Sequence, residues 1–242
     1  MNEKNYTILI AEELAAAGNN DAMLELIRNQ FHEDNNSCLS GDNEKILRYL
    51  HILAEGGNGY AMRHIGNIYN RGSGVEQNYM EAKKWYERAA EKLDTYAICT
   101  LGYIYYYGKG VEVDYEKAYK YFSQAAFMKN VNAIYKLGDM FYFGVHVKED
   151  KNAAFFWYDE ANSYDCHDYE QASIDYRLGK CYLYGHGTEQ DLPEALGYLS
   201  SAEKSLVEQL QDGNPYGVAD LILPNVIKEL DIARSMVREL IK

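Results

Sequence analysis

The chain has 242 residues, of which 47% are hydrophobic and 25% are charged, and its formal net charge is −13. This length suits one large domain or two small ones, and the composition is typical of a soluble globular protein. Because nucleic acids and anionic membranes are bound by basic surfaces, the acidic charge argues against both as the main partner.

The first 60 residues are the most acidic part of the chain, with ten Asp and Glu against four Lys and Arg. A solvated, solubilising surface explains this charge, and a docking surface for a basic partner is the alternative. The apolar run at residues 8–11 ends at Glu12 and is too short for a signal sequence or a membrane span. Tyr49 and Ala54 lie 36 residues before Trp85 and Ala90, so the pattern of the later chain continues weakly into this part and predicts helices near residues 5–17, 20–31 and 43–55.

From residue 61 onward the sequence repeats itself. Four glycines, Gly66, Gly102, Gly138 and Gly179, are 36, 36 and 41 residues apart, and five further columns follow the same spacing. These columns hold a second glycine, an aromatic residue of the first helix, an alanine, an aromatic residue of the second helix and another alanine: Gly72, Gly108, Gly144, Gly185; Tyr69, Tyr105, Phe141, Tyr182; Ala82, Ala118, Ala154, Ala195; Trp85, Tyr121, Trp157, Tyr198; Ala89, Ala125, Ala161, Ala202. A period of this length is typical of a helical hairpin that stacks on its neighbours.

Each repeat has the pattern of two helices joined by a short loop. Ile65 and its apolar neighbours lie on one face of a first helix, and Gly66 inside that helix costs about 1 kcal/mol relative to alanine. We therefore expect a neighbouring helix to approach closely at the glycine. Gly72 is placed to end the first helix, and Asn78 to cap a second helix that buries Trp85.

These patterns predict an all-α fold, a right-handed α-α superhelix (solenoid) of stacked antiparallel helical hairpins. We expect one domain that contains degenerate N-terminal repeats, four regular repeats and C-terminal capping helices, at residues 1–60, 61–96, 97–132, 133–173, 174–204 and 205–242. The cap includes an amphipathic helix from about Asn225 to Ile241.

The pattern that begins at Ala97, A-x-x-x-L-G-x-x-Y-x-x-G-x-G-V-x-x-D-x-x-x-A-x-x-Y-F-x-x-A-A, resembles the Sel-1-like repeat, a branch of the tetratricopeptide-type helical repeats. The resemblance implies adaptors, scaffolds and signalling components with diverse partners. The third repeat departs from the pattern, because His146 replaces the second loop glycine, and we expect that loop to differ in shape.

The four cysteines form no C-x-x-C pair and lack the spacing of the disulfide-bonded, secreted relatives of this family. We expect free thiols in a reducing compartment and a cytoplasmic location. A bacterial origin is inferred from the abundance of the family in bacteria.

The chain holds 24 tyrosines, and several fall on the side of the first helices opposite the glycines. In tetratricopeptide-like solenoids the first helices line the concave surface, so the resemblance implies a tyrosine ladder there. The predicted partner-binding residues are Tyr103, Tyr106, Tyr135, Asp139, Tyr142, Tyr176 and Lys180. The alternative is that these tyrosines pack between repeats or form plain surface.

Two short segments resemble chemical sites. Asp165, Cys166, His167 and Asp168 are potential metal ligands, but adjacent residues seldom converge on one ion, and a solvated loop is the preferred interpretation. Ser201 and Lys204 form the S-x-x-K motif of penicillin-recognising enzymes without its companion motifs. No cofactor motif is present.

We therefore predict a non-catalytic protein–protein interaction module, an adaptor, scaffold or regulatory or neutralising subunit, with an unidentified protein or peptide partner and no cofactor or metal. We expect a monomer or weak homodimer. The alternatives are a hydrolase that acts on a β-lactam-like substrate and a self-assembling structural protein.

Overall fold

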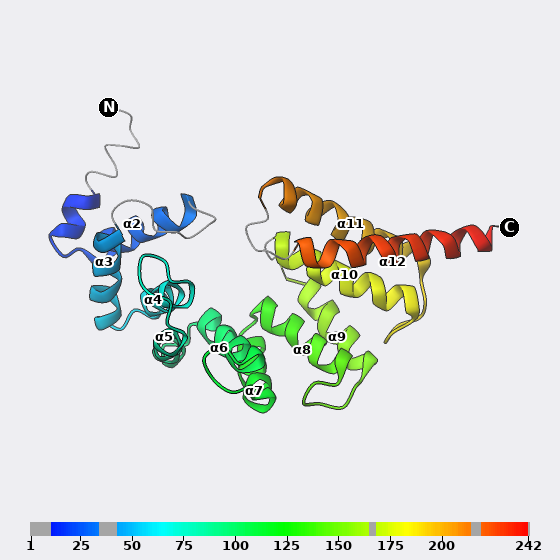
Figure 1. Ribbon diagram of the computed structural model, residues 1–242, viewed down its shortest axis with the longest axis horizontal. Coiled ribbons are helices and arrows are strands. Elements are labelled where there is room, and N and C mark those ends of the chain that lie inside the picture. The colour runs from blue at the N-terminus through cyan, green and yellow to red at the C-terminus, as the bar shows by residue number, and fades with distance from the viewer. Residues whose placement is uncertain (1–10, 34–42, 165–167, 214–218, 242) are drawn as a thin grey trace. The chain divides into compact units, whose positions relative to one another are not determined.

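The computed structural model describes residues 11–33, 43–164, 168–213 and 219–241, and every regular element in these ranges is an α-helix (Figure 1). Within each of the chain's two compact units, consecutive helices pack against one another, so the predicted all-helical repeat fold is confirmed. The chain forms two compact units, Met1–Asp114 and Tyr115–Lys242. The single solenoid domain expected from the sequence stays a prediction.

The N-terminal unit contains a helical segment at residues 11–16, followed by α2 (Asn20–Glu33), α3 (Asn43–Glu55), α4 (Gly59–Arg71), α5 (Tyr79–Glu91) and α6 (Thr95–Tyr107). Each helix from α2 to α5 contacts the next one along the chain. The predicted helices at 20–31 and 43–55 are confirmed. The first half of the helix predicted at 5–17 lies outside the described residues.

The C-terminal unit contains α7 (Tyr115–Phe127), α8 (Val131–Phe143), α9 (Lys151–Asn162), α10 (Asp168–Tyr184), α11 (Leu192–Gln211) and α12 (Ala219–Leu240). Helix α12 packs on α10 and α11, and its Val226 and Leu230 are buried in one cluster with Leu199 and Leu206. The predicted capping helix is therefore present.

Helix α12 begins six residues before the predicted start at Asn225, because the proline at position 224 does not end it. A proline removes the hydrogen bond to the carbonyl four residues earlier, which here belongs to Asp220 in the first turn. The buried side chain of Ala219 anchors that turn against the core.

The helix ends follow the predicted capping chemistry. Asn78, Asp150 and Asp191 accept a hydrogen bond from the backbone amide three residues later and begin α5, α9 and α11. Gly72 ends α4 in the left-handed conformation, with φ of 71°. A second set of caps, which the sequence reasoning missed, begins the first helices of the hairpins: Asn58, Asp94 and Asn130.

We expected the loop of the third repeat to differ in shape, but the φ angle at its substituted position is close to that in the second repeat. His146 adopts a φ of 65°, close to the 71° of Gly110, the equivalent glycine of the second repeat. A side chain in this left-handed region costs roughly 1–2 kcal/mol. The ring of Tyr119 lies 5.5 Å from the His146 ring and packs against it.

The glycines inside the first helices allow the close approach predicted for them. A Cβ atom on Gly66 would lie 2.7 Å from Cε1 of Tyr86, and one on Gly138 would lie 2.5 Å from Cε1 of Tyr158. These rings come from the second helix of the same hairpin, one residue after the predicted Trp85 column. Tyr86 and Tyr158 are both fully buried. The glycine of the first helix and the tyrosine ring of the second helix form the centre of each of these two hairpins.

We predict opposite effects for two Gly→Ala substitutions within helices. Gly66→Ala forces a Cβ into the Tyr86 ring and should lower the free energy of unfolding by about 1–3 kcal/mol. Gly197 in α11 has no atom within 4 Å of an ideal Cβ, so Gly197→Ala should raise it by about 0.5–1 kcal/mol. Urea denaturation measures both, and equal effects would contradict the close-packing role of Gly66.

His64 is a buried titratable group in the core of the N-terminal unit. It is 7% exposed, and its ring lies 4.2 Å from the ring of Tyr60. Burial, together with the charges of Arg63 and Arg71, lowers the pKa of His64 from 6.5 to about 3. The imidazole is therefore neutral in the folded protein at pH values well above 3.

We predict that acid destabilises the N-terminal unit through His64. As the pH falls from 6.5 towards 3, the unfolded chain takes up a proton at this side chain that the folded chain does not. The free energy of unfolding should therefore decrease across this window. Chemical denaturation at several pH values should show a flatter dependence for His64→Leu than for the unmodified protein. Identical slopes would show that His64 does not titrate as proposed.

Candidate functional site

The predicted partner-binding residues fall in both units. Tyr103 and Tyr106 lie on α6 of the N-terminal unit, and the other five lie on α8 and α10 of the C-terminal unit: Tyr135, Asp139, Tyr142, Tyr176 and Lys180. The structure brings these five together through shared neighbours. Whether any of the seven binds a partner stays a prediction.

Three tyrosines gather near the end of α6. The rings of Tyr103 and Tyr107 are stacked at 6.1 Å, and Tyr106 meets Tyr107 edge to face at 4.9 Å. Tyr107 is 55% exposed, and Tyr103 and Tyr106 are partly exposed. This cluster offers an accessible aromatic surface, and the sequence reasoning missed its most exposed member.

The repeat spacing identifies equivalents of Tyr107 in the next two repeats. Phe143 at the end of α8 and Tyr184 at the end of α10 are 52% and 40% exposed. This column lies one residue after the predicted column of Tyr106 and Tyr142. The same repeat alignment could have found it, since an aromatic residue recurs there three times.

Asp139 is the centre of a buried polar network rather than an exposed contact residue. Its side chain, 4% exposed, accepts hydrogen bonds from Tyr158 Oη at 2.9 Å, Arg177 Nε at 2.8 Å and Lys136 Nζ at 3.1 Å. Burial alone raises the pKa of a carboxyl group, but Arg177 and Lys136 outweigh it and hold the pKa of Asp139 below its usual value. The carboxylate joins α8, α9 and α10.

Tyr142 and Tyr176 are also buried, which corrects the expectation that these columns face solvent. Tyr142 is 6% exposed; its hydroxyl lies 2.9 Å from Nδ1 of His186, and Lys151 Nζ lies 3.6 Å from its ring centre. Tyr176 is 8% exposed and belongs to the core cluster completed by α12. Both rings therefore lie in the core of the C-terminal unit, beneath its exposed residues.

Lys180 connects α10 to the capping helix. Its Nζ lies 3.7 Å from the Glu229 carboxylate of α12, and the Tyr184 hydroxyl donates a hydrogen bond to the same carboxylate. Burial lowers the pKa of Lys180, and Glu229 opposes this shift. Part of the predicted binding face of α10 is thus occupied by α12 itself.

The suspected chemical motifs do not assemble in the part of the chain that the structure describes. Residues 165–167 of the suspected metal loop lie outside it, and the described residues contain no group of three His, Cys, Asp or Glu that could hold a metal ion. Ser201 Oγ donates to Asp175 Oδ2 at 2.6 Å, whereas Lys204 Nζ lies 3.9 Å from the Glu208 carboxylate. Ser201 and Lys204 therefore use different partners.

Cys181 is a free, buried thiol, and Cys99 is also buried. Burial raises the pKa of the Cys181 thiol to about 12, so this side chain is an inert thiol at neutral pH. Cys38 and Cys166 lie outside the described residues. Among the described helices, none combines the length and the apolar composition needed to cross a membrane.

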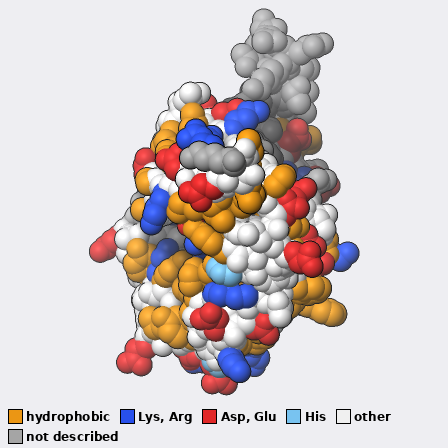
Figure 2. Space-filling model, turned by 90° about the vertical axis from the view of Figure 1, so that its right-hand side faces the viewer, with side chains coloured by type: hydrophobic (Ala, Val, Ile, Leu, Met, Phe, Trp, Pro, Cys, Tyr) orange, Lys and Arg blue, Asp and Glu red, His pale blue; other side chains and the backbone are white. Residues whose placement is uncertain are grey.

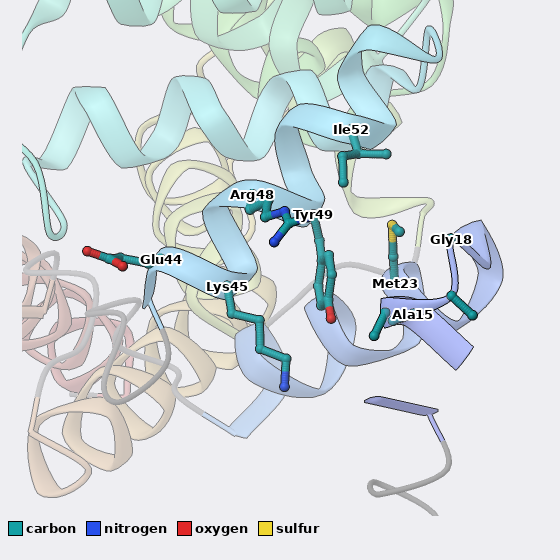
Figure 3. A pocket seen from close by; sticks show the side chains of 10 residues that line it. Ala15, Gly18, Met23, Glu44, Lys45, Arg48, Tyr49 and Ile52 are labelled. Atoms are coloured by element: carbon teal, nitrogen blue, oxygen red, sulfur yellow. The ribbon is translucent and has the colours of Figure 1, made fainter. Parts of the chain in front are cut away.

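A groove of about 1090 Å³ opens in the N-terminal unit beside α3. Figure 3 shows Lys45, Tyr49 and Ile52 of α3 facing this groove opposite Ala15 and Met23. Its walls combine apolar side chains with a basic rim. Lys45 Nζ pairs with the Glu12 carboxylate at 2.7 Å, so part of that charge is already neutralised.

The sequence matches the model of the Sel1 repeat at residues 59–92, 95–126, 131–163 and 175–204. The chain belongs to the Sel1 repeat family. The four matched segments correspond to the four regular repeats expected from the glycine spacing.

Solved structures similar to this Sel1 repeat protein include a Sel1 repeat protein from Oxalobacter formigenes. It is 26% identical with a TM-score of 0.68, and the match covers 92% of this chain and 60% of that one. A protective antigen present in uropathogenic Escherichia coli strains, with an SLR fold, is 24% identical with a TM-score of 0.66, over 96% of this chain and 51% of that one. This chain thus spans between half and two thirds of these relatives. No curated protein sequence matches it.

We predict that Asp139 contributes to folding more than any surface carboxylate. Asp139→Ala removes the buried carboxylate that pairs with the largely buried Arg177 and Lys136, and should lower the free energy of unfolding by about 3–5 kcal/mol. Asp139→Asn should cost less, because the amide oxygen still accepts from Tyr158. Asp159→Ala, an exposed position on α9, is the matched control. Denaturation curves that coincide for Asp139→Ala and Asp159→Ala would rule out the network as a stabilising element.

Proposed function

We propose that this Sel1 repeat protein is a non-catalytic protein–protein interaction module, an adaptor, scaffold or regulatory subunit that binds a peptide or protein partner. The observation that carries the proposal is the recurrence of an exposed aromatic ring at the end of three successive first helices, at Tyr107, Phe143 and Tyr184. Large exposed aromatic side chains are unfavourable in water and common at binding hot spots.

The surroundings of these rings support a binding role. Arg177 lies 5.1 Å from the ring centre of Phe143, and the Tyr184 hydroxyl is held by Glu229. Tyr107 is flanked by Tyr103 and Tyr106. A ring held by its neighbours loses little conformational entropy when a partner covers it. Figure 2 shows hydrophobic side chains exposed between acidic and basic ones on one face of the molecule.

The proposal assigns two roles to the residues predicted from the sequence. In the N-terminal unit, Tyr103 and Tyr106 are partly exposed and would touch a partner together with Tyr107. In the C-terminal unit, Tyr135 and Lys180 are partly exposed and would do so together with Phe143 and Tyr184. The buried Asp139, Tyr142 and Tyr176 would hold the exposed rings and the basic side chains of the C-terminal unit in place. The partner-binding surface is thereby displaced by one residue along each first helix.

The hydrolase alternative has weaker support. A nucleophile needs a base within hydrogen-bond reach and donors for a developing oxyanion. Ser201 donates to Asp175, and no histidine lies in the hollow that Ser201 lines among the described residues. A reducing, cytoplasmic location is part of the proposal, because Cys181 is a free thiol.

Affinity capture from cell lysate, followed by mass spectrometry, tests the proposal. The triple variant Tyr107→Ser, Phe143→Ser, Tyr184→Ser should lose at least about tenfold of any captured partner, since hot-spot rings contribute about 2 kcal/mol or more each. The variant Phe127→Ser, Phe156→Ser removes two exposed rings from second helices, which are 91% and 59% exposed, and should retain the partner. Circular dichroism verifies that both variants are folded. Equal capture by all three proteins would refute binding through the exposed rings.

A further inference from the structure

The fourth repeat departs from the other three at positions that meet in space. Where the first three repeats bury Met62, Ile98 and Ile134, the fourth buries Asp175 at the equivalent place, with 3% exposure. Two long side chains of the second helix are also replaced by small ones. Gly197 stands where the other repeats have Lys84, Lys120 and Phe156, and Ser201 stands where they have Arg88, Gln124 and Glu160.

These replacements open a hollow of about 370 Å³ between α9, α10 and α11 in the C-terminal unit. Gly197 forms part of its wall, and six polar side chains line the rest: Asn162, Gln171, Asp175, Glu194, Tyr198 and Ser201. The hollow does not include the exposed rings at the ends of the first helices. A ligand in the hollow would therefore bind independently of a partner held by those rings.

The carboxylate at the base of this hollow is held in a fixed orientation. Ser201 Oγ donates to Asp175 Oδ2 at 2.6 Å, and Gln171 Nε2 donates to Oδ1 at 2.7 Å. Gln171 Nε2 also donates to Asn162 Oδ1 at 2.8 Å. Burial raises the pKa of Asp175, which the two hydrogen bonds partly oppose. A carboxylate in an aliphatic column is costly for folding, and no ion pair among the described residues explains this one.

Gly197 has no packing role that explains its presence in a helix. Unlike Gly66 and Gly138, it has no atom within 4 Å of an ideal Cβ, yet glycine is less favourable than alanine inside a helix. Its effect is to leave the approach to Asp175 open along the exposed surface of α11. A function that requires space accounts for the glycine.

The hollow attracts positive charge. Burial raises the pKa of the Tyr198 phenol, and the charges of Glu194, Asp159 and Asp175 raise it further. No lysine or arginine lines the hollow among the described residues, and these residues include no cluster that could hold a metal ion. Tyr198 is stacked on Tyr182 with ring centres 5.7 Å apart, which fixes an aromatic wall beside the carboxylates.

We propose that this hollow binds an arginine side chain of a basic protein partner. A guanidinium group is planar, permanently charged and able to donate several hydrogen bonds while it stacks on an aromatic ring. The Asp175 and Glu194 carboxylates supply the negative charge, and the Tyr198 ring supplies the stacking face. The charge of −13 favours association with a basic partner at long range.

The probe that tests this proposal is the tripeptide Gly-Arg-Gly, capped at both ends, compared with the same peptide containing neutral, nearly isosteric citrulline. Titration followed by amide NMR should show shifts at Gly197 and Tyr198 with the arginine peptide. Binding of the citrulline peptide should be at least about tenfold weaker, since a hydrogen bond to a charged group contributes roughly 1.5–3 kcal/mol.

Two lysine substitutions on α11 complete the experiment. Gly197→Lys restores the residue type of the first two repeats, fills the hollow and favours the helix, so it should abolish binding without loss of thermal stability. Ser200→Lys adds the same charge at an exposed position that does not line the hollow, and it should retain most of the affinity. Equal binding of the two peptides, or equal affinities for Gly197→Lys and unmodified protein, would overturn the proposal.

Discussion

The α4–α5 and α8–α9 hairpins depend on one contact, in which a tyrosine ring of the second helix lies directly on a glycine of the first. At Gly66 and Gly138 no side chain larger than hydrogen fits beneath the tyrosine. The residue after each glycine accepts a hydrogen bond from the tyrosine hydroxyl. Asn67 accepts from Tyr86 at 2.8 Å, and Asp139 accepts from Tyr158 at 2.9 Å. The glycine sets the distance between the helices. The acceptor forms a hydrogen bond with the tyrosine hydroxyl, which burial of the ring removes from water.

Variation in this acceptor explains how the C-terminal unit is held together. In the third repeat the acceptor is charged, so Asp139 also binds Arg177 from the following repeat. In the fourth repeat Leu199 replaces the tyrosine and has no hydroxyl to satisfy. Lys180, at the acceptor position, pairs instead with Glu229 of α12. A single column of the repeat thus supplies an intra-hairpin bond, a link between repeats and the attachment of the capping helix.

The sequence was sufficient to predict most helices, the caps of the second helices and the role of the glycines, because these depend on local spacing and backbone conformation. The caps of the first helices, Asn58, Asp94 and Asn130, were missed. It did not reveal which aromatic residue of the pair Trp85 and Tyr86 covers the glycine, since both recur with the same period. The buried state of Tyr176 depends on α12, which lies outside the repeat pattern. The hollow beside Asp175 required knowledge of which columns meet in space. Its Gln171 occupies the capping column of Asn58, yet lies inside the longer α10.

The contact between Asp139 and Arg177 also bears on how such an array can change in length. In a solenoid of equivalent units, a repeat could be lost or duplicated with little penalty, because each unit would meet the same neighbour. Here Arg177 is matched to the acceptor of the third repeat alone. Excision of that repeat would present Tyr103, from the same column of the second repeat, to a buried guanidinium that requires an anion. The third and fourth repeats are therefore specific neighbours, because no other repeat carries an acidic residue in the column of Asp139 or an arginine in the column of Arg177.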